Sequence, residues 1–171
     1  MKFIFIFIII TTYLHSSLKD INSFEADFIQ SITDDKKNVL TYTGHIIASK
    51  PQNAKWNYIK PIQKEVYINR FEVTIIEPEI EQVIIKRVEL EFDFFNMIGK
   101  AKEIKENIYL AKYNNSEFTI ILSEKLIKSI IYIDEFENNV EIVFKNQKQN
   151  NKIDLKKFTP IFPLYYDIIR D

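Results

Sequence analysis

The sequence predicts a mainly β-sheet protein that follows a short export signal. Short runs of alternating apolar and polar residues recur along the chain, turn-forming residues separate these runs, and one long apolar segment stands near residue 1. The chain has 171 residues, of which 46% are hydrophobic, and this is enough for one domain with a sizeable core. We therefore expect a single domain over residues 18–171, after a signal peptide over residues 1–17.

The N-terminal segment has the composition of a secretory signal peptide. Lys2 is followed by an unbroken apolar run over residues 3–10, which two threonines, a tyrosine and a leucine extend to residue 14 before His15. A membrane-spanning helix needs about 20 apolar residues, so this run is short for a span. The small residues Ser16 and Ser17 are typical of a cleavage site, and an uncleaved membrane anchor is the alternative.

The alternation of a half-buried strand is clearest just after this segment. Phe24, Ala26 and Phe28 alternate with acidic residues, and residues 42–50 continue the period of two. Further short strands are expected at residues 55–59, 65–68, 72–76, 82–86, 108–113, 117–122, 128–133 and 140–144. Asparagine, which tolerates positive φ, occurs between several of these runs, as expected for antiparallel hairpins. The polar segment 145–152 is predicted to be a hairpin tip.

Two segments depart from the strand pattern. Apolar residues recur at helical spacing over residues 90–100, which predicts a short amphipathic helix. A second short helix is expected at residues 17–22, where Leu18 and Ile21 lie on one side and the chain leads into the first strand.

The composition lacks the residues that most catalytic and metal sites require. Cysteine is absent, which excludes disulfides, thiolate metal sites, a cysteine nucleophile and an acylated cysteine anchor. The two histidines are His15 and His45, and the two glycines are Gly44 and Gly99, so zinc-site, nucleophile-elbow and phosphate-loop signatures are missing. We expect no metal and no cofactor, and the net charge of -1 argues against nucleic acid as a partner.

Clustered carboxylates are the remaining candidates for chemistry. A general acid and base of a hydrolase could come from one of three groups, namely Asp34 with Asp35, Glu89 with Glu91 and Asp93, or Asp134 with Glu135 and Glu137. Acidic residues are also common at turns and at helix N-termini, where they face the positive end of the helix dipole. We favour these structural roles and predict that the protein is not an enzyme, with a carboxylate hydrolase as the alternative.

Several motifs, taken in order, resemble those of the outer-membrane lipoprotein carrier (LolA) family. The opening Phe-x-Ala-x-Phe-x-Gln of the family matches residues 24–30, and its Gly-x-Leu-x-Val-x-Arg-Pro strand is similar to residues 44–51. Further matches are Trp56, Pro61, Glu81 with Gln82, the Met-containing segment 95–101, and the stretch KKFTPIFP near the C-terminus. The resemblance spans nearly the whole predicted mature chain.

The resemblance implies a fold and a function. The fold would be an incomplete antiparallel β-barrel, or half-barrel, with short helices as a lid over an apolar cavity. The protein would be a monomeric periplasmic chaperone for lipoprotein transport and outer-membrane biogenesis. It would bind the acyl chains of lipoproteins released by an inner-membrane ABC transporter and pass them to an outer-membrane lipoprotein receptor. Burial of each methylene gains about 0.8 kcal/mol, so acyl chains need a dry pocket to cross water.

Other functions remain open within the same fold. A related periplasmic binding or sensor protein could take another lipid or amphiphile as its ligand. The receptor at the outer membrane has a similar fold but needs a lipidated cysteine, and the absence of cysteine argues against that role.

The resemblance also implies the site residues. Lys50 stands where the family has an arginine that holds the lid closed through hydrogen bonds to helix backbone, and alternation places it on the face of Ile46 and Ala48. Lysine lacks the planar fork of arginine, and a strand-end lysine that reaches solvent is the alternative. The cavity is expected to be lined by residues that could equally be plain core, namely Phe24, Phe28, Ile46, Ala48, Trp56, Phe95, Met97 and Ile98.

Overall fold

The computed structural model describes residues 18–69, 71–87, 93–113 and 115–170, so the predicted signal peptide lies outside the described residues. Within these ranges, one sheet holds twelve strands in the order β12-β6-β5-β4-β3-β2-β1-β11-β10-β9-β8-β7. The strands are β1 (Ser23–Thr33), β2 (Val39–Ser49), β3 (Asn53–Lys60), β4 (Lys64–Ile68), β5 (Glu72–Glu77), β6 (Gln82–Arg87), β7 (Lys102–Lys105), β8 (Ile108–Tyr113), β9 (Ser116–Ser123), β10 (Leu126–Ile133), β11 (Asn139–Gln149) and β12 (Asp167–Arg170). Because β12 and β7 are opposite ends of this order, the sheet is open, and the predicted mainly β fold is confirmed.

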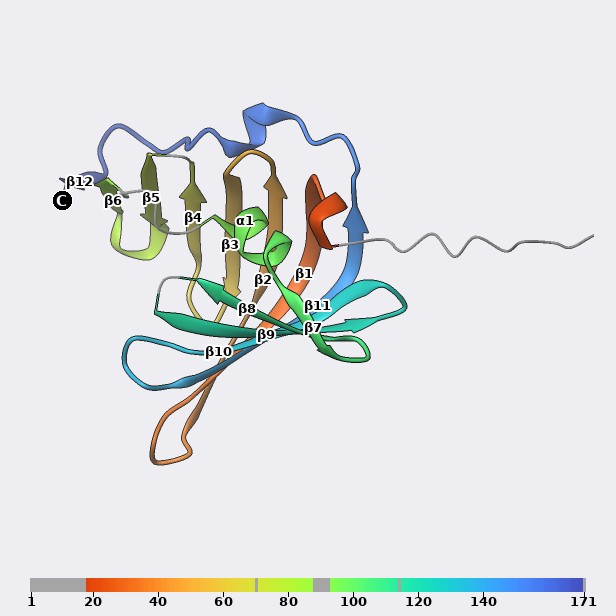
Figure 1. The fold of residues 1–171 in the computed structure, drawn as a ribbon. Helices are drawn as coiled ribbons and strands as arrows, with labels where there is room; N and C mark the ends of the chain where they lie inside the picture. Colours follow the sequence, from red (N-terminus) through yellow and green to blue (C-terminus); the bar gives the residue numbers. More distant parts are fainter. Residues whose placement is uncertain (1–17, 70, 88–92, 114, 171) are drawn as a thin grey trace, which may run out of the picture.

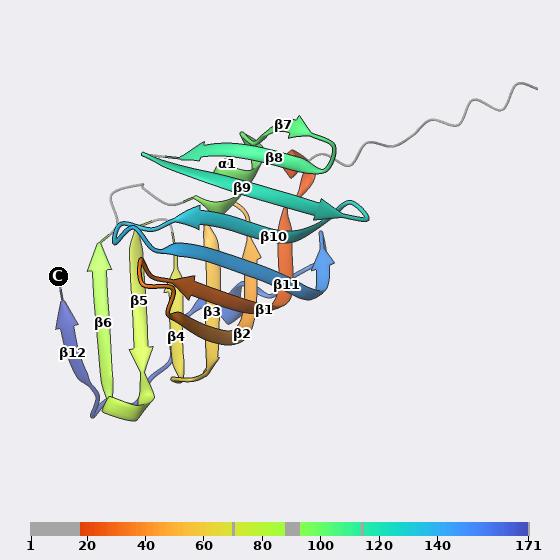
Figure 2. The ribbon, with the colours of Figure 1, turned by 90° about the horizontal axis from the view of Figure 1, so that it is seen from below.

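The sheet curves strongly instead of lying flat (Figure 1). Figure 2 shows β3 to β6 aligned side by side, each antiparallel to its neighbour, and β8 to β10 crossing them at a steep angle. The strands that join the two halves are the longest, since β1, β2 and β11 have 11 residues each. The β1–β11 register shifts between Glu25 and Asp27, and the β2–β3 register shifts between Thr43 and Gly44. Such irregularities increase local twist and bend, and the result is one concave face.

The helical segments are short. They are η1 (Leu18–Asp20), η2 (Pro78–Ile80), α1 (Phe94–Gly99) and η3 (Leu155–Phe158). The helices predicted at residues 17–22 and 90–100 are therefore confirmed in part, as η1 and α1, while residues 88–92 lie outside the described residues. No helix among the described residues is long and apolar enough to span a membrane.

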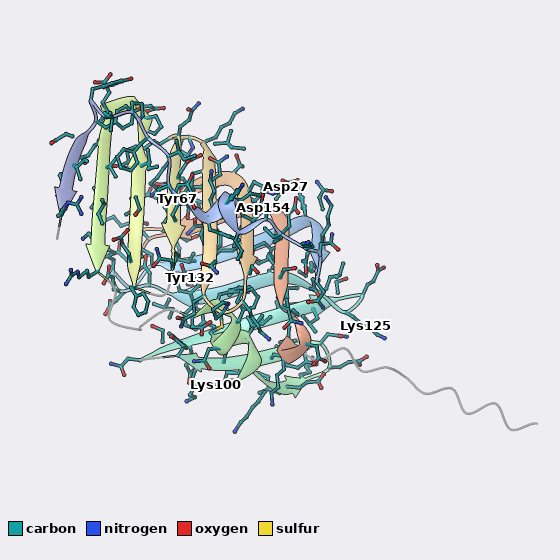
Figure 3. The ribbon with its side chains drawn as sticks, turned by 90° about the horizontal axis from the view of Figure 1, so that it is seen from above. Asp27, Tyr67, Lys100, Lys125, Tyr132 and Asp154 are labelled. Atoms are coloured by element: carbon teal, nitrogen blue, oxygen red, sulfur yellow. The ribbon has the colours of Figure 1, made fainter. Side chains whose placement is uncertain are left out.

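Two cores lie on opposite faces of the sheet. The larger core lies on the concave face, where inward residues of β1 and β2 pack against the apolar side of α1. The smaller core lies on the outer face, where Tyr67, Ile76 and Val83 are covered by Phe162 and Tyr166. These last two residues belong to the segment that connects β11 to β12, and Figure 3, in which Tyr67 and Asp154 are labelled, shows this segment along the outer face.

The polar stretch after residue 144 is not the predicted hairpin tip. Residues 145–149 continue β11, and Lys145, Lys148 and Gln149 pair with residues of β1. The hydrogen-bonding needs of the β1 backbone explain the difference, because a neighbouring strand satisfies them whatever side chains it carries. The chain turns after this strand, at Asn150, which has a φ of 59°.

Two short edge strands were absent from the prediction. All residues of β7 and β12 are exposed, so neither strand has an alternating apolar face that the sequence could display. The strand β12 also departs from the expected antiparallel arrangement, because it pairs parallel with β6.

Candidate functional site: an apolar cavity beneath helix α1

A cavity of about 350 Å³ lies between α1 and the concave face of the sheet. Its size falls within the range of about 300–1,000 Å³ that is usual for ligand pockets. Most of its wall is apolar, and the lining residues are Gln30, Trp56, Tyr58, Val66, Ile68, Phe94, Met97, Phe118, Ile130, Tyr132 and Ile142. The wall therefore comes from both halves of the curved sheet and from α1.

A smaller pocket adjoins the cavity beside the β2–β3 turn. Trp56, Ile68 and Phe94 line both spaces, and Ile46 and Phe95 line the smaller one. The indole of Trp56 thus stands between two apolar spaces, next to α1.

The predicted cavity residues divide into two groups. Trp56 and Met97 line the main cavity, and Ile46 and Phe95 line the smaller pocket. Phe24, Phe28, Ala48 and Ile98 are all at most 2% exposed and pack behind the wall.

The packed aromatic residues support the wall from behind. The ring of Phe28 lies 5.0 Å from that of Trp56 and 5.1 Å from that of Tyr58, between ring centroids. The ring of Phe24 contacts Phe94 of α1 at 5.7 Å. The opening motif thus supports the residues that face the cavity, because aromatic pairs prefer particular relative orientations of their rings.

Several lining residues were missed by the sequence prediction. Tyr58 lies two residues after Trp56, so the period of two already placed it on the same face. Phe118, Ile130 and Ile142 lie on the far half of the sheet, and only the curvature of the long strands brings them opposite Trp56. No local pattern in the sequence carried that information.

The cavity also contains polar groups that are neutral at physiological pH. The hydroxyl of Tyr58 donates a hydrogen bond to Oε1 of Gln30 at 3.1 Å. Burial raises the pKa of Tyr58, and the neighbouring Tyr132 and Tyr42 raise it further. Burial is also the main cause that raises the pKa of Tyr132, with a smaller contribution from Asp134. Both hydroxyls therefore remain protonated hydrogen-bond donors.

Helix α1 is fixed at its N-terminus by one carboxylate. Asp93 accepts hydrogen bonds from the backbone N–H of Asn96 and from Nε2 of Gln52, both at 3.0 Å. The backbone N–H of Asp93 donates to the hydroxyl of Tyr113 at 2.9 Å. The predicted structural role of Asp93 as a helix-start acid is confirmed, whereas Glu89 and Glu91 lie outside the described residues.

Lys50 is exposed, just beyond the end of β2, and reaches the other helical segment. Its ammonium group donates to the backbone carbonyl of Lys19 in η1 at 3.0 Å and to Oδ1 of Asn22 at 3.1 Å. Since η1 packs against α1, the turn that holds Lys50 and Gln52 contacts both helical segments.

The other carboxylate clusters and His45 lie away from the cavity. Asp34 accepts hydrogen bonds from the backbone N–H and the side-chain amide of Asn38. Asp134 accepts the equivalent two hydrogen bonds from Asn138. Each aspartate thus closes a hairpin loop, as predicted. His45 is on the outer face, where its Nδ1 lies 2.8 Å from Oδ1 of Asp27. Among the described residues, no group of three histidine, cysteine or acidic side chains is placed to hold a metal ion.

Two solved structures share this fold and have little sequence similarity to the chain. An uncharacterized conserved protein from Thermus thermophilus matches with a TM-score of 0.54 and 11% identity, over 90% of this chain and 93% of its own. A LolA superfamily protein from Nitrosomonas europaea matches with a TM-score of 0.53 and 12% identity, over 82% of this chain and 91% of its own. These similarities concern the fold alone.

Sequence comparison gives the family. The family model for the outer membrane lipoprotein carrier protein LolA matches residues 19–94. The outer-membrane lipoprotein carrier protein of Campylobacter jejuni is 40% identical over 169 residues, which are 99% of each chain. That of Helicobacter hepaticus is 30% identical over 98% of this chain and 94% of its own. The chain therefore belongs to the family of outer-membrane lipoprotein carrier proteins.

Proposed function

We propose that this protein is a periplasmic chaperone that binds the acyl chains of lipoproteins from the inner membrane and carries them to the outer membrane. The observation that supports this function best is the apolar cavity beneath α1, in a chain of the lipoprotein carrier family. Residues 1–17 act as the export signal, and residues 18–171 act as one carrier domain. An inner-membrane ABC transporter loads the cargo, and an outer-membrane receptor accepts it.

The cavity is small for several acyl chains, and the adjoining concave surface offers more room. Directly paired residues of neighbouring strands point to the same side of a sheet. One such row runs from the buried Ile46 through Trp56 to the edge strand β12, over Val66, Ile75, Ile84 and Ile169. Ile75 and Ile84 are half-buried and Ile169 is 42% exposed, so this row extends the apolar wall of the cavity. It suits acyl chains that the cavity does not hold.

In this proposal, α1 is the lid of the cavity. Phe94 and Met97 of α1 face the cavity, so displacement of α1 would widen it. The turn after β2 holds the lid in place through two side chains, since Lys50 binds η1 and Gln52 binds the cap of α1. Lys50 thus acts as a latch through η1, in the position where the family has arginine.

The function can be tested by release of lipoproteins from spheroplasts. Protein purified after expression of the full chain is added, and newly made lipoproteins are measured in the soluble fraction as complexes with it. We expect stoichiometric release by the unchanged protein and reduced release by Ile84→Glu, which places a charge in the apolar row. Ile133→Glu is the matched control, because Ile133 is 58% exposed and, next to Tyr132 on β10, points to the opposite face.

Each outcome of this assay has a clear meaning. Release that depends on Ile84 but not on Ile133 supports the carrier function. Absence of release by the unchanged protein contradicts it, and a different amphiphile in lipid extracts of that protein would identify it as a binding protein for another ligand.

A further inference from the structure

The polar groups of the cavity are gathered at one end of it. Along β1, inward-facing residues follow in the order Phe24, Ala26, Phe28 and Gln30. Phe24 contacts Phe94 of α1, and Gln30 lies six residues further along β1, or about 20 Å at 3.3 Å per residue. The cavity is thus apolar near α1 and polar at the level of Gln30.

Three strands bring polar side chains to this end. Gln30 comes from β1, Tyr58 from β3 and Tyr132 from β10, and all three line the cavity. The ring of Tyr132 is held by Phe118 at 5.0 Å, and that of Tyr58 by Phe28 at 5.1 Å, between centroids. These side chains come from both halves of the sheet, so they converge only in the folded protein.

Two hydrogen-bond donors at this end have no partner among the residues that the structure describes. The Tyr58 hydroxyl uses Oε1 of Gln30 as its acceptor, which leaves the two N–H bonds of the Gln30 amide directed elsewhere. Among the described residues, no hydrogen bond is made by the Gln30 side-chain nitrogen or by the Tyr132 hydroxyl, and no side-chain polar atom is both fully buried and unsatisfied. Both donors therefore remain available within the cavity.

We infer that Gln30, Tyr58 and Tyr132 form a polar subsite that binds the carbonyl group through which an acyl chain is joined to its headgroup. This inference rests on the proposed function and adds the orientation of the ligand. Ester and amide carbonyls accept hydrogen bonds and carry no charge, which suits neutral amide and hydroxyl donors in an apolar cavity. The carbonyl lies between Gln30 and Tyr132, Tyr58 holds the Gln30 amide in place, and the hydrocarbon tail extends toward α1.

The test compares two ligands that differ only in this carbonyl. Monolauroylglycerol has an ester, and dodecylglycerol ether has the same chain length and headgroup but no carbonyl. Each ligand displaces the fluorescent probe N-phenylnaphthylamine from protein purified after expression of the full chain. One well-formed hydrogen bond favours the ester by about threefold to tenfold in affinity.

The variants separate the subsite from the cavity as a whole. Gln30→Met and Tyr132→Phe each remove one of the two donors with little change of volume, and we expect each to lower the ester-to-ether ratio. Val66→Ala is the control, because it trims the apolar wall and weakens both ligands alike without changing the ratio.

The outcomes distinguish this inference from the carrier function. A preference for the ester that falls in Gln30→Met or Tyr132→Phe supports the subsite. Binding of both ligands with no preference, or a preference that both variants keep, overturns the subsite and leaves the carrier function standing. Binding of neither ligand by the unchanged protein counts against the proposed function itself.

Discussion

At the scale of single residues, the two glycines have very different surroundings. A Cβ atom on Gly44 would lie 2.2 Å from the backbone oxygen of Asn57 and 2.6 Å from Cζ of Phe28. The same atom on Gly99 would lie 3.8 Å from Cγ of Lys19, which is an ordinary van der Waals contact and the nearest among the described residues. Gly44 is therefore needed for the close approach of Phe28 and β3, which in turn support Trp56.

We expect Gly44→Ala to destabilise the protein strongly. The backbone of β3 would have to shift, and overpacking of this kind costs about 1–3 kcal/mol, or a fall in melting temperature of several degrees. Thermal unfolding followed by circular dichroism measures the effect. Gly99→Ala, at the other glycine, should change the melting temperature little, and equal melting temperatures for both variants would show that the crowding at Gly44 is unimportant.

A second residue-scale prediction concerns Asp27 on the outer face. Hydrogen bonds from the Asn146 amide at 2.7 Å and from His45 at 2.8 Å hold the pKa of Asp27 below its usual value. A lowered pKa in the folded state means that the carboxylate stabilises the fold above the unfolded pKa of about 3.9. This contribution is lost as the pH falls through the lower, folded pKa.

The change Asp27→Asn should therefore lower stability at neutral pH and have no effect in strong acid. Because the side chain is half-exposed, we expect a fall in melting temperature of only about 1–3 °C at neutral pH. Thermal unfolding at neutral pH and near pH 2 measures the difference. Asp35→Asn, at an exposed turn, is the control, and an Asp27→Asn effect of equal size at both pH values would contradict the prediction.

At the scale of elements, the turn between β2 and β3 determines how α1 and η1 are held. Lys50 and Gln52 are two residues apart, yet one binds the backbone of η1 and the other binds the N-cap of α1. The side chains of α1 line the cavity, so in the proposed function the bonds that hold α1 in place compete with cargo.

We predict that Lys50→Leu still accepts lipoprotein but fails to pass it on. Loss of the hydrogen bonds from the Lys50 ammonium group favours the state in which α1 is displaced and cargo is bound. Exposed charge contacts are worth up to about 1 kcal/mol, which corresponds to about fivefold stronger retention of cargo. Transfer of bound lipoprotein to outer-membrane vesicles measures this. Lys60→Leu is a close control, because Lys60 is also an exposed lysine at a strand end and directly before a proline. Normal transfer by Lys50→Leu would refute the latch.

At the scale of the whole molecule, the sequence predicted the strands better than the shape of the site. Alternation located ten of the twelve strands within the described residues and put Phe24, Phe28 and Ile46 on the inner face. Alternation did not predict which inner-face residues line the cavity and which are buried in the core. That division arises only when β1, β2 and β11 bend. Tyr132 and Ile142 line the cavity because strands that are distant in the sequence pair with one another, which alternation along one strand does not reveal.

The central claim is that acyl chains occupy the cavity beneath α1, and the single tryptophan of the chain offers a direct test. Trp56 lines both the cavity and the smaller pocket, and bromine quenches indole fluorescence on contact. The measurement is Trp56 fluorescence during titration with a stearoylglycerol whose chain is brominated, compared with the unbrominated lipid. We predict saturable quenching by the brominated lipid alone. Binding of the brominated lipid without any quenching would place the acyl chain elsewhere and contradict the account.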